Sequence, residues 1–150
     1  MPKFDVTDEF VIDAPPNAVY KALLDEFAGS THLFMPYYEC KIGGDRPIDN
    51  EGAIFDLAVH NGRMTSKLSC KITKLVEAKT IEVNYDGDIL ATEKYTFESM
   101  NGGTKLKLRF NGKTNSVLVS LLSLFVNIGK GHSDMMESGF KALNNYLSNK

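Results

Sequence analysis

The sequence SVLVSLLSLFVNIGKGHSD, residues 116–134, begins with a run that is apolar at nearly every position and ends in two glycines and a histidine. From Val117 to Ile128 only two serines and one asparagine interrupt the run. A helix of this sequence carries apolar side chains around most of its circumference, which is not the pattern of a surface helix. We therefore expect this segment to be covered on several sides by other elements of the fold.

The helical pattern continues from this run to the end of the chain. Apolar or small residues recur at spacings of three and four, which is one continuous helical face: Leu118, Leu122, Phe125, Gly129, His132, Met136, Phe140, Leu143 and Leu147. Glycine lowers helix propensity by about 1 kcal/mol relative to alanine, so the helix is either continuous or broken near Gly129 and Gly131. We predict one long C-terminal helix from about Ser116 to Leu147, with a bend as the alternative.

The first forty residues contain a strand followed by two short helical segments. Residues 4–14 alternate apolar and polar side chains, which predicts a strand with one buried face. Prolines 15 and 16 suit the first turn of a helix, and apolar residues then recur every four positions up to Phe27. The stretch 29–38 predicts a second small helical turn that ends at Pro36.

From Tyr37 to about Gly112 the alternation has a period of two, interrupted by glycine-rich turns such as NG at 61–62 and NGG at 101–103. This pattern predicts six antiparallel strands with one apolar and one polar face. Glu93 is the exception, because it falls on the apolar parity together with Ala91 and Tyr95. A buried carboxylate needs a partner or a raised pKa; the alternative is a bulge that turns Glu93 to solvent.

Composition and charge narrow the function classes. The chain has 150 residues, is 43% hydrophobic and 24% charged, and has a formal net charge of -2, as expected for one globular domain without a basic surface for nucleic acid. Its start has no signal-peptide pattern and its longest apolar run is shorter than a membrane span, so we expect a soluble cytoplasmic protein without an integral membrane segment. Cys40, Cys70 and the three histidines match no metal-binding spacing. We expect two buried, reduced thiols and neither a metal nor a cofactor.

The order of elements predicts an α+β fold of one domain over residues 1–150: one strand, two short helices, six strands and a long helix. It resembles the helix-grip fold of the START-like, polyketide-cyclase and lipid-transport superfamily (SRPBCC), which includes the birch-pollen allergen. The resemblance is carried by FVIDAPPNAVYKAL (10–23), FMPYYECKIGG (34–44), EGAIF (51–55), NGGTKLKLRF (101–110) and MMESGFKALNNYL (135–147). It implies a curved antiparallel sheet of six to seven strands wrapped around the C-terminal helix, often with a hydrophobic ligand between them.

The predicted ligand-binding residues face inward from the strands or lie on the helical face. They are Phe55, Leu57, Leu68, Cys70, Tyr85, Glu93, Tyr95, Leu108, Leu122, Phe125, His132 and Met136. Glu93 is the candidate catalytic residue, because a carboxylate next to a tyrosine can transfer protons. His132 is a further candidate for this proton transfer, although we expect it to pack beside the glycines.

Three function classes follow. The one we favour is a non-catalytic binder or carrier of a small hydrophobic molecule such as a lipid, an isoprenoid or a polyketide-like compound. The second is a cyclase or dehydratase that uses Glu93 with a tyrosine, which requires these groups to converge in a pocket. The third is a co-chaperone-like or subunit-type interaction module, which requires a contiguous exposed apolar patch. A homodimer is left open.

Overall fold

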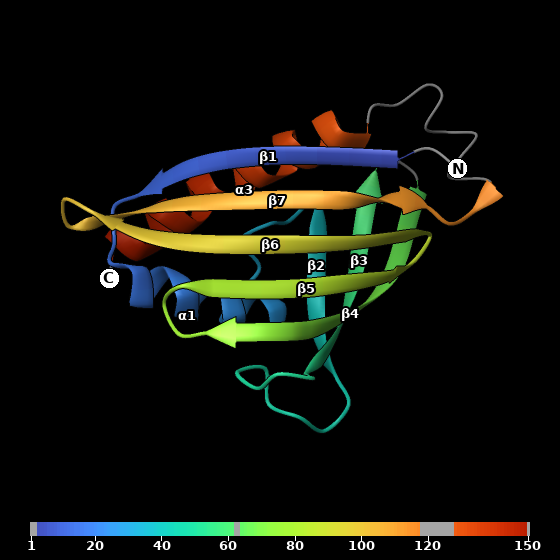
Figure 1. Ribbon diagram of the computed structural model, residues 1–150, viewed down its shortest axis with the longest axis horizontal. Coiled ribbons are helices and arrows are strands. Elements are labelled where there is room, and N and C mark those ends of the chain that lie inside the picture. The colour runs from blue at the N-terminus through green and yellow to red at the C-terminus, as the bar shows by residue number, and fades with distance from the viewer. Residues whose placement is uncertain (1–2, 62–63, 118–127, 150) are drawn as a thin grey trace.

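A computed structural model describes residues 3–61, 64–117 and 128–149. Its main feature is one antiparallel sheet of seven strands in the order β1-β7-β6-β5-β4-β3-β2. Consecutive strands pair as neighbours except that β1 closes against β7, the last strand (Figure 1). The strands are β1 (Lys3–Ile12), β2 (Tyr38–Gly43), β3 (Ile54–Asn61), β4 (Met64–Val76), β5 (Thr80–Gly87), β6 (Ile89–Met100) and β7 (Gly103–Thr114).

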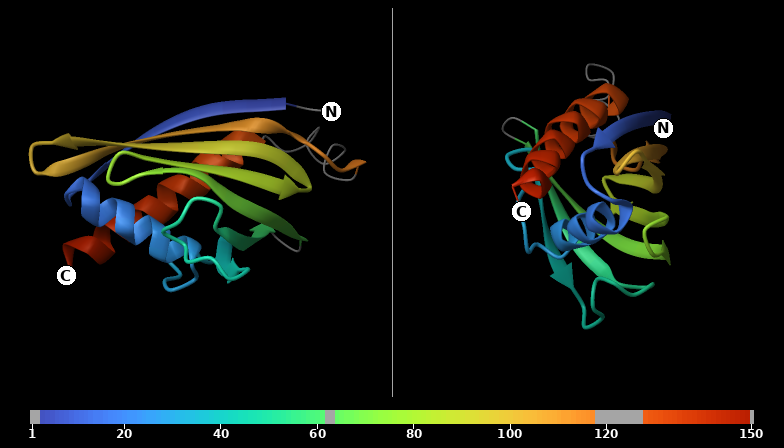
Figure 2. Two further views of the ribbon diagram at one scale, coloured as in Figure 1. Left: turned by 60° about the horizontal axis from the view of Figure 1, so that its bottom comes forward. Right: turned by 90° about the vertical axis from the view of Figure 1, so that its left-hand side faces the viewer.

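Helices α1 (Pro16–Phe27) and α3 (Ile128–Ser148) lie on the same, inner side of the curved sheet (Figure 2). Pro16 occupies the first turn of α1, where its missing N–H costs no intrahelical hydrogen bond. The side of α3 that faces inward is apolar, with Met136, Phe140 and Leu143 buried. This is the predicted helix-grip arrangement. Within the described residues, no helix has the length and apolar character needed to cross a membrane.

The predicted parity of the strands is confirmed. Inward-facing residues such as Ile72, Val83 and Leu106 are fully buried, whereas Lys107 and Arg109 on the alternate parity of β7 are exposed. The pairing register of β4 and β5 shifts between Ile72 and Lys74, which is a bulge of the kind that bends a sheet. An apolar core therefore lies between the sheet and the two helices.

One detail differs from the prediction. The segment expected to be a second short helix forms hydrogen-bonded turns over residues 33–37, and the Met35–Pro36 peptide bond is cis. Proline at this position has no N–H for a continuing helical ladder. The described part of the C-terminal helix, α3, begins at Ile128 and contains Gly129 and Gly131 in its first turn. Most of the apolar run, including Leu122 and Phe125, lies outside the described residues; of its two ends, Val117 is 72% exposed and Ile128 packs against the core.

Candidate functional site

A partly open cavity of about 430 Å³ lies between the inner face of the sheet and α3. Strands β2 to β7 form one wall, α3 forms another, and Phe27 at the end of α1 contributes to the floor. The lining is mainly apolar and aromatic: Phe27, Tyr37, Tyr38, Cys40, Phe55, Leu57, Val59, Leu68, Tyr85, Ile89, Phe110, Ile128, Gly131, Met135 and Met136. The polar members are His60, Glu93, His132 and Asp134. This volume and lining are typical of small-molecule sites.

The cavity brings together seven of the twelve residues that the sequence singled out. They are Phe55, Leu57, Leu68, Tyr85, Glu93, His132 and Met136. Cys70, Tyr95 and Leu108 are buried in the core but do not line the cavity. Strand parity predicts the face of the sheet on which a residue lies, and not its position along the strand. Leu122 and Phe125 lie outside the described residues.

Several lining residues were not predicted. Phe110 shares the inward parity of β7, and Tyr38 and Cys40 share that of β2, so parity was the available signal for all three. His60 and Asp134 carried no such signal. His60 bonds Thr65 on the neighbouring strand, and Asp134 accepts a hydrogen bond from Lys130 one helical turn earlier.

Glu93 does face inward, and its shortest contact is with His132; Tyr85 and Tyr95, the expected partners, lie close enough to be affected by its charge. The Glu93 side chain on β6 is 1% exposed, and its Oε2 atom lies 2.7 Å from Nε2 of His132 on α3. The His132 side chain is 10% exposed. The predicted misfit on the apolar strand is therefore a buried carboxylate–imidazole pair that connects the sheet to the helix, and the bulge alternative is wrong for Glu93.

Two further contacts hold this part of α3 in place. The imidazole ring of His132 stacks on Phe110, with ring centroids 4.0 Å apart and planes at 8°. The next residue, Ser133, donates a hydrogen bond of 2.8 Å to Oδ2 of Asp8 on β1. Asp8 lies on the same strand parity as Phe4, Val6 and Phe10. Neighbouring residues of α3 thus bind β6 and β1, the two strands that flank β7, which fixes the position of the imidazole.

The pair is incompletely satisfied. Oε1 of Glu93 and Nδ1 of His132 are buried and have no hydrogen-bond partner among the described residues. Burial raises the pKa of Tyr85 and of Tyr95 well above the usual value of 10.0, and the Glu93 charge raises both further. Both phenols therefore stay protonated near neutral pH, where they can donate hydrogen bonds but act neither as bases nor as effective acids. The chemistry available is hydrogen bonding or proton transfer by the Glu93–His132 pair, beside neutral phenols.

A second buried carboxylate, Glu26 at the end of α1, holds the loop that carries Tyr37 and Tyr38. Its side chain is fully buried. Oε1 accepts hydrogen bonds from Thr31 Oγ1 at 2.6 Å and from the Leu33 N–H at 3.0 Å, and Oε2 accepts one from the Phe34 N–H at 3.2 Å. Sequence reasoning missed Glu26, because its donors come from a loop that folds back onto the helix.

The buried thiols of Cys40 and Cys70 are expected to lower the free energy of unfolding at alkaline pH. Burial, with smaller effects of neighbouring charged groups, raises the pKa of Cys40 and of Cys70 far above the usual value of 9.0. Above pH 9 the unfolded chain loses both thiol protons while the folded chain retains them. Each thiol is therefore expected to lower the free energy of unfolding by about 1.4 kcal/mol per pH unit. Urea titrations between pH 8 and pH 11 measure this slope.

The Cys40→Ala and Cys70→Ala variants supply the control for this prediction. Each substitution removes one ionising thiol, so each is expected to flatten the alkaline slope by one thiol's share. Slopes that match that of the unsubstituted protein in both variants would show that the thiols do not cause the loss of stability.

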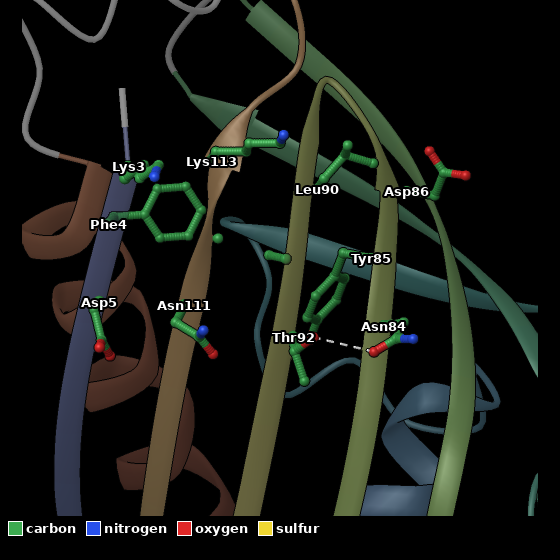
Figure 3. Close-up of a pocket in the computed structure, with 12 residues that line it drawn as sticks. Lys3, Phe4, Asp5, Asn84, Tyr85, Asp86, Leu90, Thr92, Asn111 and Lys113 are labelled. Atoms are coloured by element: carbon green, nitrogen blue, oxygen red, sulfur yellow. Dashed lines mark hydrogen bonds between the residues drawn. The ribbon is translucent and has the colours of Figure 1, made fainter. Parts of the chain in front are cut away.

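A larger pocket, of about 910 Å³, opens at the ends of β1, β7, β6 and β5 (Figure 3). Its polar side chains are exposed or already bonded. Asp5 accepts two hydrogen bonds from Arg109, and the Thr92 hydroxyl donates to Asn84 Oδ1 at 3.1 Å. Because exposed groups of this kind are solvated, the pocket lacks the buried, unsatisfied atoms of the inner cavity. The inner cavity is therefore the candidate site.

Comparisons with known proteins agree with this architecture. No protein-family model and no curated protein sequence matches the chain. Among solved structures, it is similar to Ara h 8.0201 (TM-score 0.73, 18% identity, 99% of this chain and 100% of the other). It is also similar to TTHA0849 from Thermus thermophilus (TM-score 0.77, 15% identity, 95% of each chain). A third similar structure is the Zhui aromatase/cyclase from Streptomyces sp. R1128 (TM-score 0.64, 15% identity, 96% of this chain and 90% of the other).

At these identities, structural likeness shows the fold alone. The likeness extends over nearly the whole chain in all three comparisons. It includes the seven-stranded sheet that curves over the C-terminal helix. The chain has the helix-grip fold.

Proposed function

We propose that the protein binds a small hydrophobic molecule in the cavity between the sheet and α3. The observation that carries this proposal is the partly open space of about 430 Å³, lined mainly by apolar and aromatic side chains. Met135 and Met136 in its wall are flexible side chains that adapt to ligands of different shape. A lipid, an isoprenoid or a polyketide-like compound fits this lining.

The cavity is partly open, so it does not stay empty: water enters it when no ligand is bound. Water or a ligand therefore fills the space, and apolar walls bind an apolar ligand more favourably than water.

Filling the cavity with protein atoms is expected to abolish binding. The Leu57→Trp and Leu68→Trp variants place an indole in the space that the ligand would occupy. We expect each to weaken binding of 2-methoxynaphthalene by at least roughly tenfold. Titration calorimetry measures the affinities, and a thermal melt of each variant establishes that it is folded.

Val11→Trp is the matched control, because Val11 is 61% exposed on β1 and does not line the cavity. This variant should bind the probe as the unsubstituted protein does. Equal affinity in all three variants would contradict the proposed location. The natural ligand can be sought in parallel, by native mass spectrometry of gently purified protein and solvent extraction of what co-purifies.

The hydrogen bond between Glu93 and His132 favours a second candidate function, a proton-transfer enzyme of cyclase or dehydratase type. A buried carboxylate that orients an imidazole is the arrangement of many general bases. The Zhui aromatase/cyclase shares the fold, which makes this chemistry compatible with the architecture. Glu93→Gln separates the two functions, because a carrier would change in affinity only, whereas a general acid or base contributes about 10²–10⁴ in rate.

A further inference from the structure

We propose that the ligand of the cavity carries a hydroxyl group that completes the Glu93–His132 pair. This inference rests on the proposed function and specifies the chemistry of one end of the ligand. It starts from the two buried atoms without a hydrogen-bond partner among the described residues, Oε1 of Glu93 and Nδ1 of His132. Both residues belong to the cavity wall, so a molecule in the cavity lies next to the pair.

The donor and acceptor atoms of the pair determine which ligand group can form the missing hydrogen bonds. One proton lies between Oε2 of Glu93 and Nε2 of His132, and the pair carries no net charge when its only other proton is on Nδ1, whichever of the two atoms holds the shared proton. Nδ1 is then a hydrogen-bond donor, and Oε1 can only accept. A ligand group at this wall must therefore donate a hydrogen bond to Oε1, and a ligand oxygen can accept one from Nδ1.

A hydroxyl group meets both requirements without adding charge. Its hydrogen is donated to Oε1, and an oxygen of the same or a second hydroxyl accepts from Nδ1. A carboxylate would bring a second negative charge next to Glu93, and a hydrocarbon would leave both atoms unpaired, which is costly in a buried site. A protonated amine cannot accept from Nδ1. The structure thus favours an apolar molecule with an alcohol or phenol at one end.

The shape of the wall supports a ring at this position. Phe110 stacks on His132 and packs edge-on against Tyr85, with ring centroids 6.0 Å apart. All three side chains line the cavity. Aromatic side chains favour aromatic ligands through stacked and edge-to-face contacts, so a phenol is the natural probe.

The test compares ligands that differ in one group. 2-Naphthol donates a hydrogen bond, 2-methoxynaphthalene has the same rings without the donor, and 2-(aminomethyl)naphthalene is a cation. We expect the protein to bind 2-naphthol at least roughly tenfold more tightly than the methyl ether, since a hydrogen bond to a charged group is involved. In long-range ¹H–¹⁵N spectra, 2-naphthol should shift the His132 ring nitrogens and leave those of His32, which does not line the cavity, unchanged.

Two variants test whether the Glu93–His132 pair causes the preference for 2-naphthol. The double variant Glu93→Leu/His132→Leu replaces the pair with apolar side chains, a change that buried pairs often tolerate, and should lose the preference for 2-naphthol. Glu98→Leu, at an exposed position of the same strand, should retain it. Tighter binding of the methyl ether or of the amine by the unsubstituted protein, or equal affinities for all three, would overturn the inference while leaving the proposed function intact. Binding of none of the probes would overturn both.

Discussion

Replacing Gly139 by alanine is expected to lower the free energy of unfolding by about 1–3 kcal/mol, although alanine is the better helix former. Gly139 lies in the middle of α3, where a Cβ atom would be 1.8 Å from the Phe34 ring. Phe34 is fully buried and cannot move aside, because it packs against Tyr38 and Phe140. Chemical denaturation of the two proteins measures the difference.

Gly131 on the same helix is the matched control. A Cβ atom there would have no neighbour within 4 Å, so Gly131→Ala is expected to raise the free energy of unfolding by up to about 1 kcal/mol. The two substitutions thus have opposite signs. Adding Phe34→Leu should partly compensate Gly139→Ala, with a favourable coupling of about 0.5–3 kcal/mol. Additive effects of Phe34→Leu and Gly139→Ala would contradict the contact between α3 and the loop.

Replacing Glu26 by alanine is expected to lower the free energy of unfolding by about 3 kcal/mol or more. The substitution removes the acceptor of three hydrogen bonds and leaves the N–H groups of Leu33 and Phe34 without it. Hydrogen bonds to a charged group contribute about 1.5–3 kcal/mol each, and a buried donor without a partner adds a desolvation cost. Urea denaturation of the variant measures the loss.

The preceding residue, Asp25, is half-buried and provides the control: Asp25→Ala should change the free energy of unfolding by no more than about 0.5 kcal/mol. Glu26→Ala should also weaken ligand binding, because the loop that Glu26 holds carries Tyr37 and Tyr38 into the cavity wall. A stability like that of the unsubstituted protein would show that the loop does not depend on the Glu26 carboxylate.

The strands and the two-sided character of the sheet could be predicted because both follow from local alternation. The alternating stretch around Leu68 and Ile72 identified the buried face of β4 correctly. The same logic singled out Glu93 as a polar residue among apolar ones. Parity cannot show how far along a strand the cavity extends, so Cys70, Tyr95 and Leu108 were assigned to the site although they belong to the packed core.

What could not be predicted depends on contacts between residues far apart in the chain. Glu93 and His132 are separated by 39 positions; both were candidates for proton transfer together with a tyrosine, but their direct hydrogen bond was not predicted. Their pairing follows from where α3 packs on the sheet, a position that Ser133 and Asp8 help to fix. Glu26 had no local signal, since its three donors lie in a loop whose path is determined by tertiary packing.

The most direct test of the central claim is to locate a bound apolar probe by intermolecular nuclear Overhauser effects. With 2-methoxynaphthalene bound to methyl-labelled protein, we predict contacts from the probe to the methyl groups of Leu57, Leu68 and Met136, which line the cavity. We predict none to Val11, which is exposed on β1. Contacts confined to exposed methyl groups, with none to the cavity wall, would contradict the account.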